Sequence, residues 1–255
     1  MFSVPHFIWM GICVVLLTVG GILLKKYKPS LQVVLNIACV ICILSELIKV
    51  FSSIEMVPNT AGTSYLPYLK PQHVPLHLCS LQILTIFYAR FAKDGPRKET
   101  LLAFMYPTCT LGAFFALLLP SIFSSGSVPL SEAFIHPLAY QFFVFHLMLI
   151  LLGVYIAASG QVNIRPKHYL STMGMLGVVA FVMLYLNSLF ASPTYVNGKL
   201  VSVDYSPNFF FLYKTPVGIK LTELWHWYLY LMILAVLAFG LIALFFIPFF
   251  RKKKA

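Results

Sequence analysis

The fold is decided by the stretch Gln72-His73-Val74-Pro75-Leu76-His77-Leu78-Cys79-Ser80-Leu81-Gln82, which continues as an apolar run to Tyr88 and ends at Arg90. A stretch of about 20 residues is long enough to cross a bilayer as a helix. Its first half nevertheless carries polar side chains, which are costly in hydrocarbon and usually face a bundle interior or a wet cavity. On a helix, His73 and His77 would share one face because they are four residues apart. We expect that face to meet polar groups from other spans.

The composition of the chain is that of a polytopic membrane protein. Of its 255 residues, 60% are hydrophobic and only 10% are charged, and a soluble domain of this size could not bury that much apolar surface. The formal net charge of +11 does not indicate a nucleic-acid partner, because the cations lie at segment ends, where they set membrane orientation. The five cysteines all fall in apolar segments and predict no disulfide framework. We predict an all-α transmembrane bundle that forms a single domain over residues 1–255.

Seven segments are long and apolar enough to be predicted as membrane spans: 5–24, 31–53, 73–92, 98–122, 137–158, 168–192 and 221–248. Thirteen of the 18 lysines and arginines fall in the loops after the first, third and fifth of them and in the carboxyl tail. This bias predicts a multi-pass protein of the cell membrane, with the amino terminus outside and the carboxyl terminus cytoplasmic. The basic tail Arg251–Lys254 is expected to bind anionic lipid headgroups.

The predicted outside loops are longer than the cytoplasmic ones, and the longest covers residues 193–220. Asn197-Gly198 lies there between two short β-prone runs, which predicts a hairpin. An apolar patch around Phe209–Phe211 follows and is too short to span the membrane. We expect the loop 193–220 to act as a lid over a site near the outside surface.

Polar and titratable side chains from five predicted spans fall at one depth, near the outside surface. The candidate site residues among them are Glu46, Lys49, His73, His77, Cys79, Gln82, His136, Tyr140, Asn187, Glu223 and His226, with Asn208 from the loop. The economical interpretation is one outward-facing cavity, because titratable groups gathered in one cleft mark a functional site. Each residue also has a structural interpretation; Glu46 and Lys49, for example, are spaced to neutralise each other.

His77 is the best candidate for a general base in this cavity, because imidazole titrates near neutral pH. Cys79 is a candidate nucleophile, but on a regular helix it would point roughly 200° away from His77. A working dyad would then need His136 or His226 from another helix, or a distorted turn near Pro75.

Metal binding is an alternative use of the histidines. The residues would be His73, His77, Glu223 and His226, since catalytic zinc commonly uses three such ligands. A single His-x-x-x-His on a membrane helix is a weak signal for that, so we predict no metal and no other cofactor.

Three blocks of sequence carry a resemblance to a known family. They are Ser45–Lys49, the block Pro75-Leu76-His77-Leu78-Cys79-Ser80-Leu81-Gln82, and Pro207–Leu212 followed by Pro216. Together they resemble the YwaF family of bacterial integral membrane proteins over essentially the whole chain. That family is similar to a eukaryotic transmembrane protein described as an acyltransferase of ether phospholipids. More distantly it resembles the androgen-induced membrane hydrolases of fatty-acid esters.

The resemblance implies a nucleophile and a histidine inside a helical bundle. The histidine would be His77, and the acyltransferase is assigned a cysteine near this histidine, for which Cys79 is the candidate. The leading hypothesis is therefore an acyltransferase or esterase that acts on membrane lipid at the outer leaflet. In it Glu46, Lys49, Glu223 and His226 would tune His77 or stabilise developing charge.

The alternative is a protein that binds or transports a small polar or anionic solute in the same outward-facing cavity. The sequence leaves the oligomeric state open.

Overall fold

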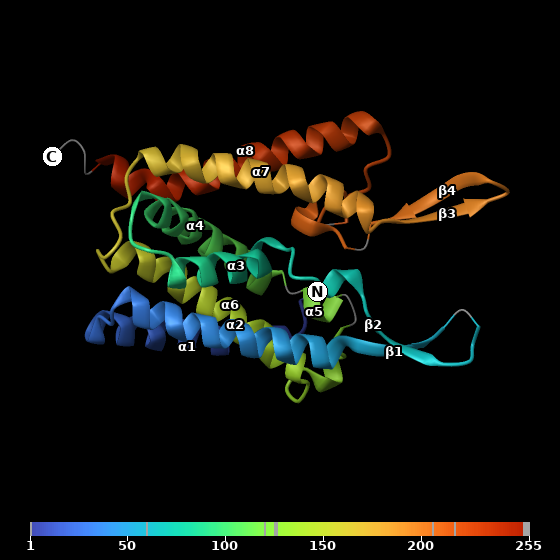
Figure 1. Cartoon of the computed structure of the whole chain (residues 1–255), viewed down its shortest axis with the longest axis horizontal. Helices are drawn as coiled ribbons and strands as arrows, with labels where there is room; N and C mark the ends of the chain where they lie inside the picture. The colour runs from blue at the N-terminus through green and yellow to red at the C-terminus, as the bar shows by residue number, and fades with distance from the viewer. Residues whose placement is uncertain are drawn as a thin grey trace. The chain divides into compact units, whose positions relative to one another are not determined.

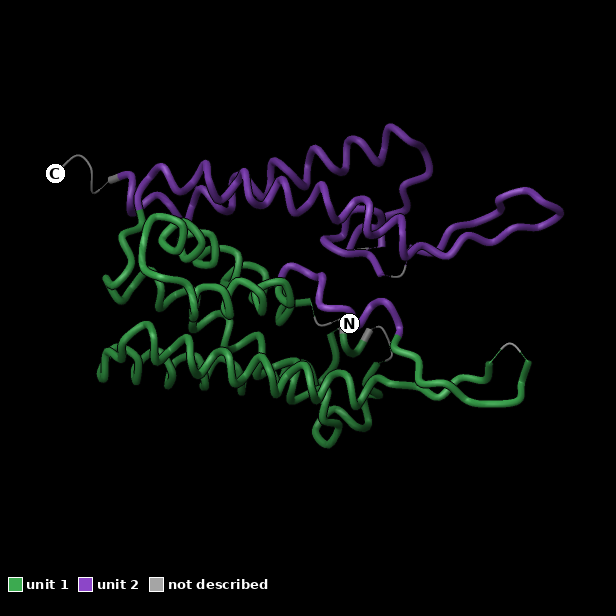
Figure 2. Tube along the Cα trace, in the orientation of Figure 1, with its two compact units in different colours: residues 1–69, 79–164 green, residues 70–78, 165–255 purple. Residues whose placement is uncertain are grey.

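The computed structural model of this chain describes residues 2–59, 61–119, 121–124, 127–205, 207–216 and 218–251. It is mostly helical and contains only two small hairpins of β-structure, which confirms the predicted all-α class (Figure 1). The chain divides into two compact units, and Figure 2 colours them separately. The first unit combines Met1–Leu69 with Cys79–Ile164, and the second combines Lys70–Leu78 with Arg165–Ala255.

The first unit is a bundle arranged around one central helix. Its helices are α1 Val4–Tyr27, α2 Leu31–Ser53, α3 Leu78–Phe91, α4 Pro96–Leu118, the short α5 Ser121–Ser124 and α6 Pro137–Ala158. Three of them, α1, α2 and α4, pack against α6. Strands β1 Ile54–Pro58 and β2 Tyr65–Leu69 form an antiparallel hairpin that projects from one end of this unit (Figure 1). A 3-10 turn, η2 Leu130–Glu132, precedes α6.

Helices α4 and α6 approach each other closely at Gly153. A Cβ atom placed on Gly153 of α6 would lie 2.3 Å from Thr110 Oγ1 and 2.9 Å from the Tyr106 carbonyl oxygen. Only a glycine therefore lets the two backbones come this near. A buried core nearby holds Trp9 stacked on Phe143, with ring centroids 4.4 Å apart.

The second unit pairs two long helices, α7 Lys167–Leu189 and α8 Leu224–Arg251. Between them lie strands β3 Ser192–Val196 and β4 Lys199–Asp204, which form an antiparallel hairpin, and the 3-10 turn η3 Phe209–Phe211. At the hairpin tip Asn197 and Gly198 have left-handed φ angles of 51° and 73°, the geometry that Asn-Gly turns provide. The segment Lys70–Leu78, with the 3-10 turn η1 Pro71–His73, belongs to this unit.

Within the described residues, six helices are long and apolar enough to cross a membrane: α1, α2, α4, α6, α7 and α8. The third predicted span, over residues 73–92, is shorter than expected, because α3 begins only at Leu78 and has 14 residues. At 1.5 Å per residue it covers about 21 Å, less than the roughly 30 Å hydrocarbon core. Two prolines explain the late start. Pro75 keeps Val74 extended, with φ −63° and ψ 135°, and Pro71 opens a separate 3-10 turn.

The outer helices carry apolar side chains on their exposed surface. In the apolar part of α1 and of α8, only 11% of the residues are buried within the protein. In water such a surface would be unstable, whereas a bilayer covers it. The protein is therefore a multi-pass membrane protein.

Candidate functional site

The two histidines of the central stretch do not share a helix face, so that prediction is wrong. His73 closes the turn η1, and His77 lies in a bend directly before α3. The extended Val74 between them breaks the helical spacing on which the prediction depended. The imidazole of His77 instead meets Phe209 edge-on, with ring centroids 5.1 Å apart and an interplanar angle of 70°.

Cys79 is the second residue of α3 and differs from the other cysteines in its exposure. Cys13, Cys39, Cys42 and Cys109 are buried, whereas Cys79 is partly exposed. Because His77 precedes the helix, the rotation of roughly 200° expected between His77 and Cys79 on a regular helix does not apply. The backbone before α3 is distorted near Pro75, and the His77–Cys79 dyad itself stays a prediction.

Gln82, one turn after Cys79, is fully buried and joins α3 to α4 through its carboxamide. Its Nε2 donates to Thr108 Oγ1 at 3.1 Å, and its Oε1 accepts from Cys109 Sγ at 3.3 Å and from Thr85 Oγ1 at 2.9 Å. A polar network thus lies inside the apolar bundle, next to the start of α3.

Sequence reasoning missed Thr108 and Cys109 as members of this network. A signal was available, because Thr108, Cys109 and Thr110 directly follow Pro107 in the interior of α4. Helix-interior prolines in membrane helices often occur with Ser or Thr side chains that satisfy freed backbone groups. Thr108 Oγ1 donates to the Phe104 carbonyl at 2.7 Å, one residue after the Ala103 carbonyl that loses its helical partner at Pro107.

Glu46 and Lys49 pair with each other along α2. The Lys49 ammonium lies 2.6 Å from Glu46 Oε1, and both side chains are mostly buried. One residue before Glu46, the buried Ser45 hydroxyl accepts a hydrogen bond of 2.6 Å from Gln141 of α6. The pair matches the structural interpretation of mutual neutralisation.

His136 and Tyr140 support the start of α6. His136 is the N-cap residue, and its Nδ1 accepts from the Leu138 amide at 3.2 Å. The Tyr140 hydroxyl donates to the Phe134 carbonyl at 2.5 Å. Both side chains therefore satisfy backbone groups at a helix end.

In the second unit, Asn187 and Asn208 hold the loop before α8. Asn187 is fully buried in α7; its Nδ2 donates to the Phe209 carbonyl at 3.0 Å, and its Oδ1 accepts from the Phe209 amide at 2.7 Å. Asn208 Oδ1 accepts from the amides of Tyr213 at 3.0 Å and Lys214 at 3.3 Å. The side-chain carboxamides of Asn187 and Asn208 thus hold the backbone of residues 208–214 in place.

That loop contains strained backbone. Phe210 and Phe211 have left-handed φ angles of 58° and 55°, which are costly for side chains other than glycine. Side chains of α8 hold the strained segment in place. Trp227 Nε1 donates to the Leu212 carbonyl at 2.9 Å, and the Tyr230 hydroxyl donates to the Phe211 carbonyl at 2.5 Å.

Tyr213 adds a fixed contact from the same loop to α7. Its hydroxyl donates to the Leu184 carbonyl at 3.2 Å. Burial, followed by the neighbouring Tyr205 ring, raises the pKa of the Tyr213 phenol above its ordinary value. The phenol therefore stays neutral and able to donate over a wide pH range.

Glu223 and His226 lie at the start of α8. His226 Nδ1 accepts from the Glu223 amide at 3.2 Å and contacts Thr222 Oγ1 at 3.2 Å. The imidazole ring also lies against Trp225, with centroids 3.9 Å apart. His226 thus satisfies an amide at the helix start, which is a capping role.

The candidate residues are distributed over both compact units. Glu46, Lys49, Cys79, Gln82, His136 and Tyr140 belong to the first, and His73, His77, Asn187, Asn208, Glu223 and His226 belong to the second. Their shared cavity stays a prediction. Within the described ranges, no group of three His, Cys, Asp or Glu side chains is placed to hold a metal ion. Of the basic tail, Lys252–Lys254 lie outside the described residues.

Comparison with known proteins gives the chain a family. The sequence profile of the TMEM164 family matches residues 1–246, nearly the whole chain. No curated protein and no solved structure shows significant similarity to it. With six apolar helices long enough to span a membrane and a match over almost its full length, the chain belongs to the TMEM164 family.

Proposed function

We propose that this protein is a membrane-embedded enzyme that transfers or hydrolyses the acyl chains of lipids, with Cys79 as its nucleophile. The observation that carries the proposal is the position of this thiol. As a whole residue, Cys79 is partly exposed at the start of α3, two residues after His77, while the other four cysteines are buried. Burial raises the pKa of the Cys79 thiol above its ordinary value, so that a base is needed to form the thiolate. A reactive cysteine needs access to its substrate and a base to remove its proton.

His77 is the proposed base. The two residues are so near in the chain that their Cα atoms lie at most about 7 Å apart. Because His77 lies in a bend and Cys79 in a helix, the helical rotation does not force the side chains apart. Phe209 contacts the imidazole ring and restricts its orientation.

The proposed reaction has two balanced halves. In the first, His77 takes the proton of the Cys79 thiol, and the sulfur attacks the ester carbonyl of a lipid. The ester C–O bond breaks, a thioester forms on Cys79, and the released lysolipid oxygen takes the proton from His77. In the second, the hydroxyl of an acceptor lipid or of water gives its proton to His77 and attacks the thioester. The acyl chain leaves, and the sulfur recovers the proton.

The environment of Cys79 supports acyl-chain chemistry. Cys79 lies in the mostly apolar helix α3, and the polar carboxamide of Gln82 lies one turn further along it. The resemblance of Pro75–Gln82 to the YwaF family, which is similar to an acyltransferase, points the same way. We place the enzyme in the cell membrane, with the lysine-rich and arginine-rich loops cytoplasmic, on the charge bias of its loops.

The alternative, a protein that binds or transports a small solute, gives no role to the thiol. The test is turnover of defined phospholipids and lysophospholipids by the purified full chain, with Cys79→Ala and His77→Ala compared with Cys39→Ala. Cys39 is a buried cysteine of α2 and serves as the matched control. We expect turnover by the wild type and by Cys39→Ala, and a loss of at least roughly 100-fold in the other two. Equal turnover in all four proteins would exclude Cys79 and His77 from the reaction.

A further inference from the structure

An open hollow of about 640 Å³ lies at the turn from α3 to α4, in the first unit. Its lining includes two aromatic side chains of α3, Tyr88 and Phe91, and four charged side chains: Lys93, Asp94, Arg97 and Lys98. Three of these four charges are positive. The lining of the hollow therefore combines an excess of positive charge with aromatic surface.

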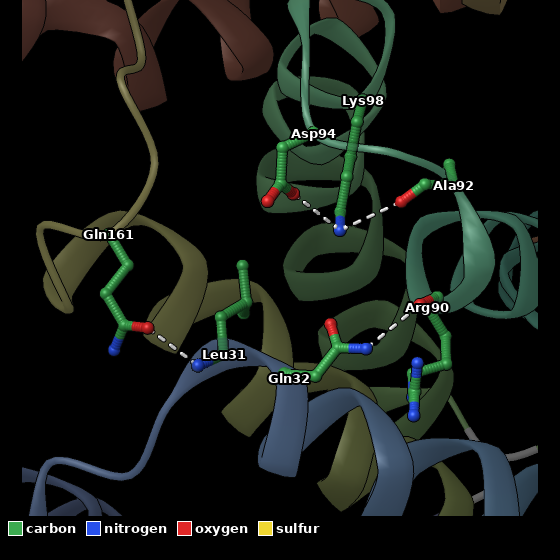
Figure 3. Close-up of polar contacts among 7 residues, drawn as sticks. All are labelled: Leu31, Gln32, Arg90, Ala92, Asp94, Lys98 and Gln161. Carbon is green, nitrogen blue, oxygen red and sulfur yellow. Dashed lines mark hydrogen bonds and ion pairs between the residues drawn. The ribbon is translucent and has the colours of Figure 1, made fainter.

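The charges of the hollow are only partly neutralised. Lys98 is buried, and its ammonium donates to Asp94 Oδ1 at 2.9 Å and to the Ala92 carbonyl at 3.3 Å (Figure 3). The Asp94 carboxylate is therefore already paired with Lys98. Lys93 and Arg97 are exposed, and across the described ranges of the chain neither forms an ion pair. Two positive charges thus remain without a counter-ion.

The position of these cations is electrostatically unfavourable in the protein alone. Arg97 and Lys98 are in the first turn of α4, a helix of 23 residues, where the helix dipole is positive, and Glu99 is the acidic residue of that turn, so two cations there stand against one carboxylate. The N-cap residue, Gly95, contributes no side-chain hydrogen bond to the free amides of that turn. An anion in the hollow would remove both disadvantages.

The surroundings of the hollow are held by polar contacts at the same end of the unit (Figure 3). Gln32 Nε2 of α2 donates to the Arg90 carbonyl at 3.2 Å, which fixes the last turn of α3. The Leu31 amide donates to Gln161 Oε1 at 2.7 Å, which fixes the start of α2. The hollow is thus built on helix ends that hold one another.

We propose that this hollow binds the phosphate group of an anionic membrane lipid. Lys93 and Arg97 would contact the phosphate oxygens, and the free amides at the start of α4 would support them. Tyr88 and Phe91 are 53% and 73% exposed, and aromatic rings at a membrane surface lie at headgroup level. A lipid, rather than a free anion, fits this combination of cations and aromatic surface. The site is independent of the proposed acyl-chain chemistry.

The test is lipid binding by the purified full chain, measured by native mass spectrometry. The probes are phosphatidylglycerol, phosphatidylcholine and inorganic phosphate. The variant is Lys93→Gln with Arg97→Gln, and Arg97→Lys retains the charge. The matched control is Lys25→Gln with Lys26→Gln, which removes two exposed cations from the last turn of α1. Equal thermal unfolding midpoints establish that all variants are folded.

We expect the wild type to prefer phosphatidylglycerol to phosphatidylcholine. The affinity of the double variant for phosphatidylglycerol should be roughly 10- to 30-fold lower than that of the wild type. Each positive charge near a membrane surface contributes about tenfold or less to such an affinity. Arg97→Lys should lose far less, and the control should change by less than about twofold. An equal loss in the control would reduce the effect to general surface charge and overturn the proposal. Displacement of phosphatidylglycerol by millimolar inorganic phosphate would overturn it in favour of a free anion.

Discussion

The side chain of Asn187 forms two hydrogen bonds with the backbone of a single residue, Phe209. Nδ2 donates to the carbonyl at 3.0 Å, and Oδ1 accepts from the amide at 2.7 Å. Both residues are fully buried, and the Phe209 ring supports His77. A buried amide of α7 therefore holds the loop before α8 and, through it, the ring beside the proposed base.

Replacement of Asn187 by Ala should destabilise the protein by roughly 2–4 kcal/mol, because two buried backbone groups lose their partners. Asn187→Asp keeps the acceptor but loses the donor and buries a carboxylate, so near neutral pH it should cost at least as much stability as Asn187→Ala. Ser188→Ala, at the exposed next position of α7, is the control and should change stability by less than about 0.5 kcal/mol. Chemical unfolding in detergent measures all three. Equal stability of Asn187→Ala and the control would contradict the buried clamp.

The left-handed backbone of Phe211 predicts an inverted preference between alanine and glycine. At φ 55°, Phe211→Gly should be more stable than Phe211→Ala by roughly 1 kcal/mol, because only glycine adopts this region without cost. At the next residue, Leu212, φ is −75° and ψ is −23°. There the alanine variant should be more stable than the glycine variant by about 0.5–1 kcal/mol. The same order of stability for the alanine and glycine variants at both positions would contradict backbone strain at Phe211.

The hydrogen bonds of Gln82 predict that an apolar side chain of similar size cannot replace it without a loss of stability. Gln82→Leu removes the partner of Cys109 and Thr85 and should cost roughly 1–3 kcal/mol. Gln82→Glu should cost more near neutral pH, because it buries a carboxylate inside the membrane bundle, and should recover as the pH falls and the carboxyl gains a proton. Gln72→Glu, outside the long helices, is the control. The free energy of unfolding, measured at several pH values, distinguishes the variants. A Gln82→Glu protein whose stability does not depend on pH would contradict the buried network.

The contact of α4 with α6 predicts opposite effects for two Gly→Ala changes. Gly153→Ala places a methyl group against Thr110 and the Tyr106 backbone, so we expect a loss of about 1–3 kcal/mol or more. Gly177→Ala in α7 meets no atom within 4 Å and should be neutral or stabilising by up to about 1 kcal/mol. Thermal unfolding of the two variants checks this. A loss of the same size in both would indicate helix flexibility rather than close packing.

Hydrophobic length predicts the long helices of this chain well. The predicted spans 31–53 and 137–158 have the bounds of α2 and α6, because a bilayer requires long uninterrupted apolar runs. The start of α3 could not be found from apolar length, since Pro75 determines it through the backbone of Val74. Proline positions therefore deserve equal weight with hydrophobicity at span ends.

The candidate site was harder to predict, because polar side chains in membrane helices have several uses. Gln82 and Asn187 were expected to line an open cavity, whereas both are fully buried, and their partners on other elements depend on packing that the sequence does not display. His136 has the helix-end role that a residue before Pro137 can take, a local signal that a search for catalytic groups passes over. The loop geometry around Asn208 depends on two phenylalanines with positive φ, which no sequence rule predicts.

The most direct test of the central claim is a search for an acyl group on Cys79. The purified full chain is incubated with a phospholipid of defined acyl chain, quenched at acidic pH and analysed by peptide mass spectrometry. We predict a thioester on Cys79 that hydroxylamine removes, that is retained in Cys39→Ala, and that His77→Ala forms at least roughly tenfold more slowly. Lipid turnover by the wild type with no acyl group on Cys79, and with equal turnover by Cys79→Ala, would contradict the account.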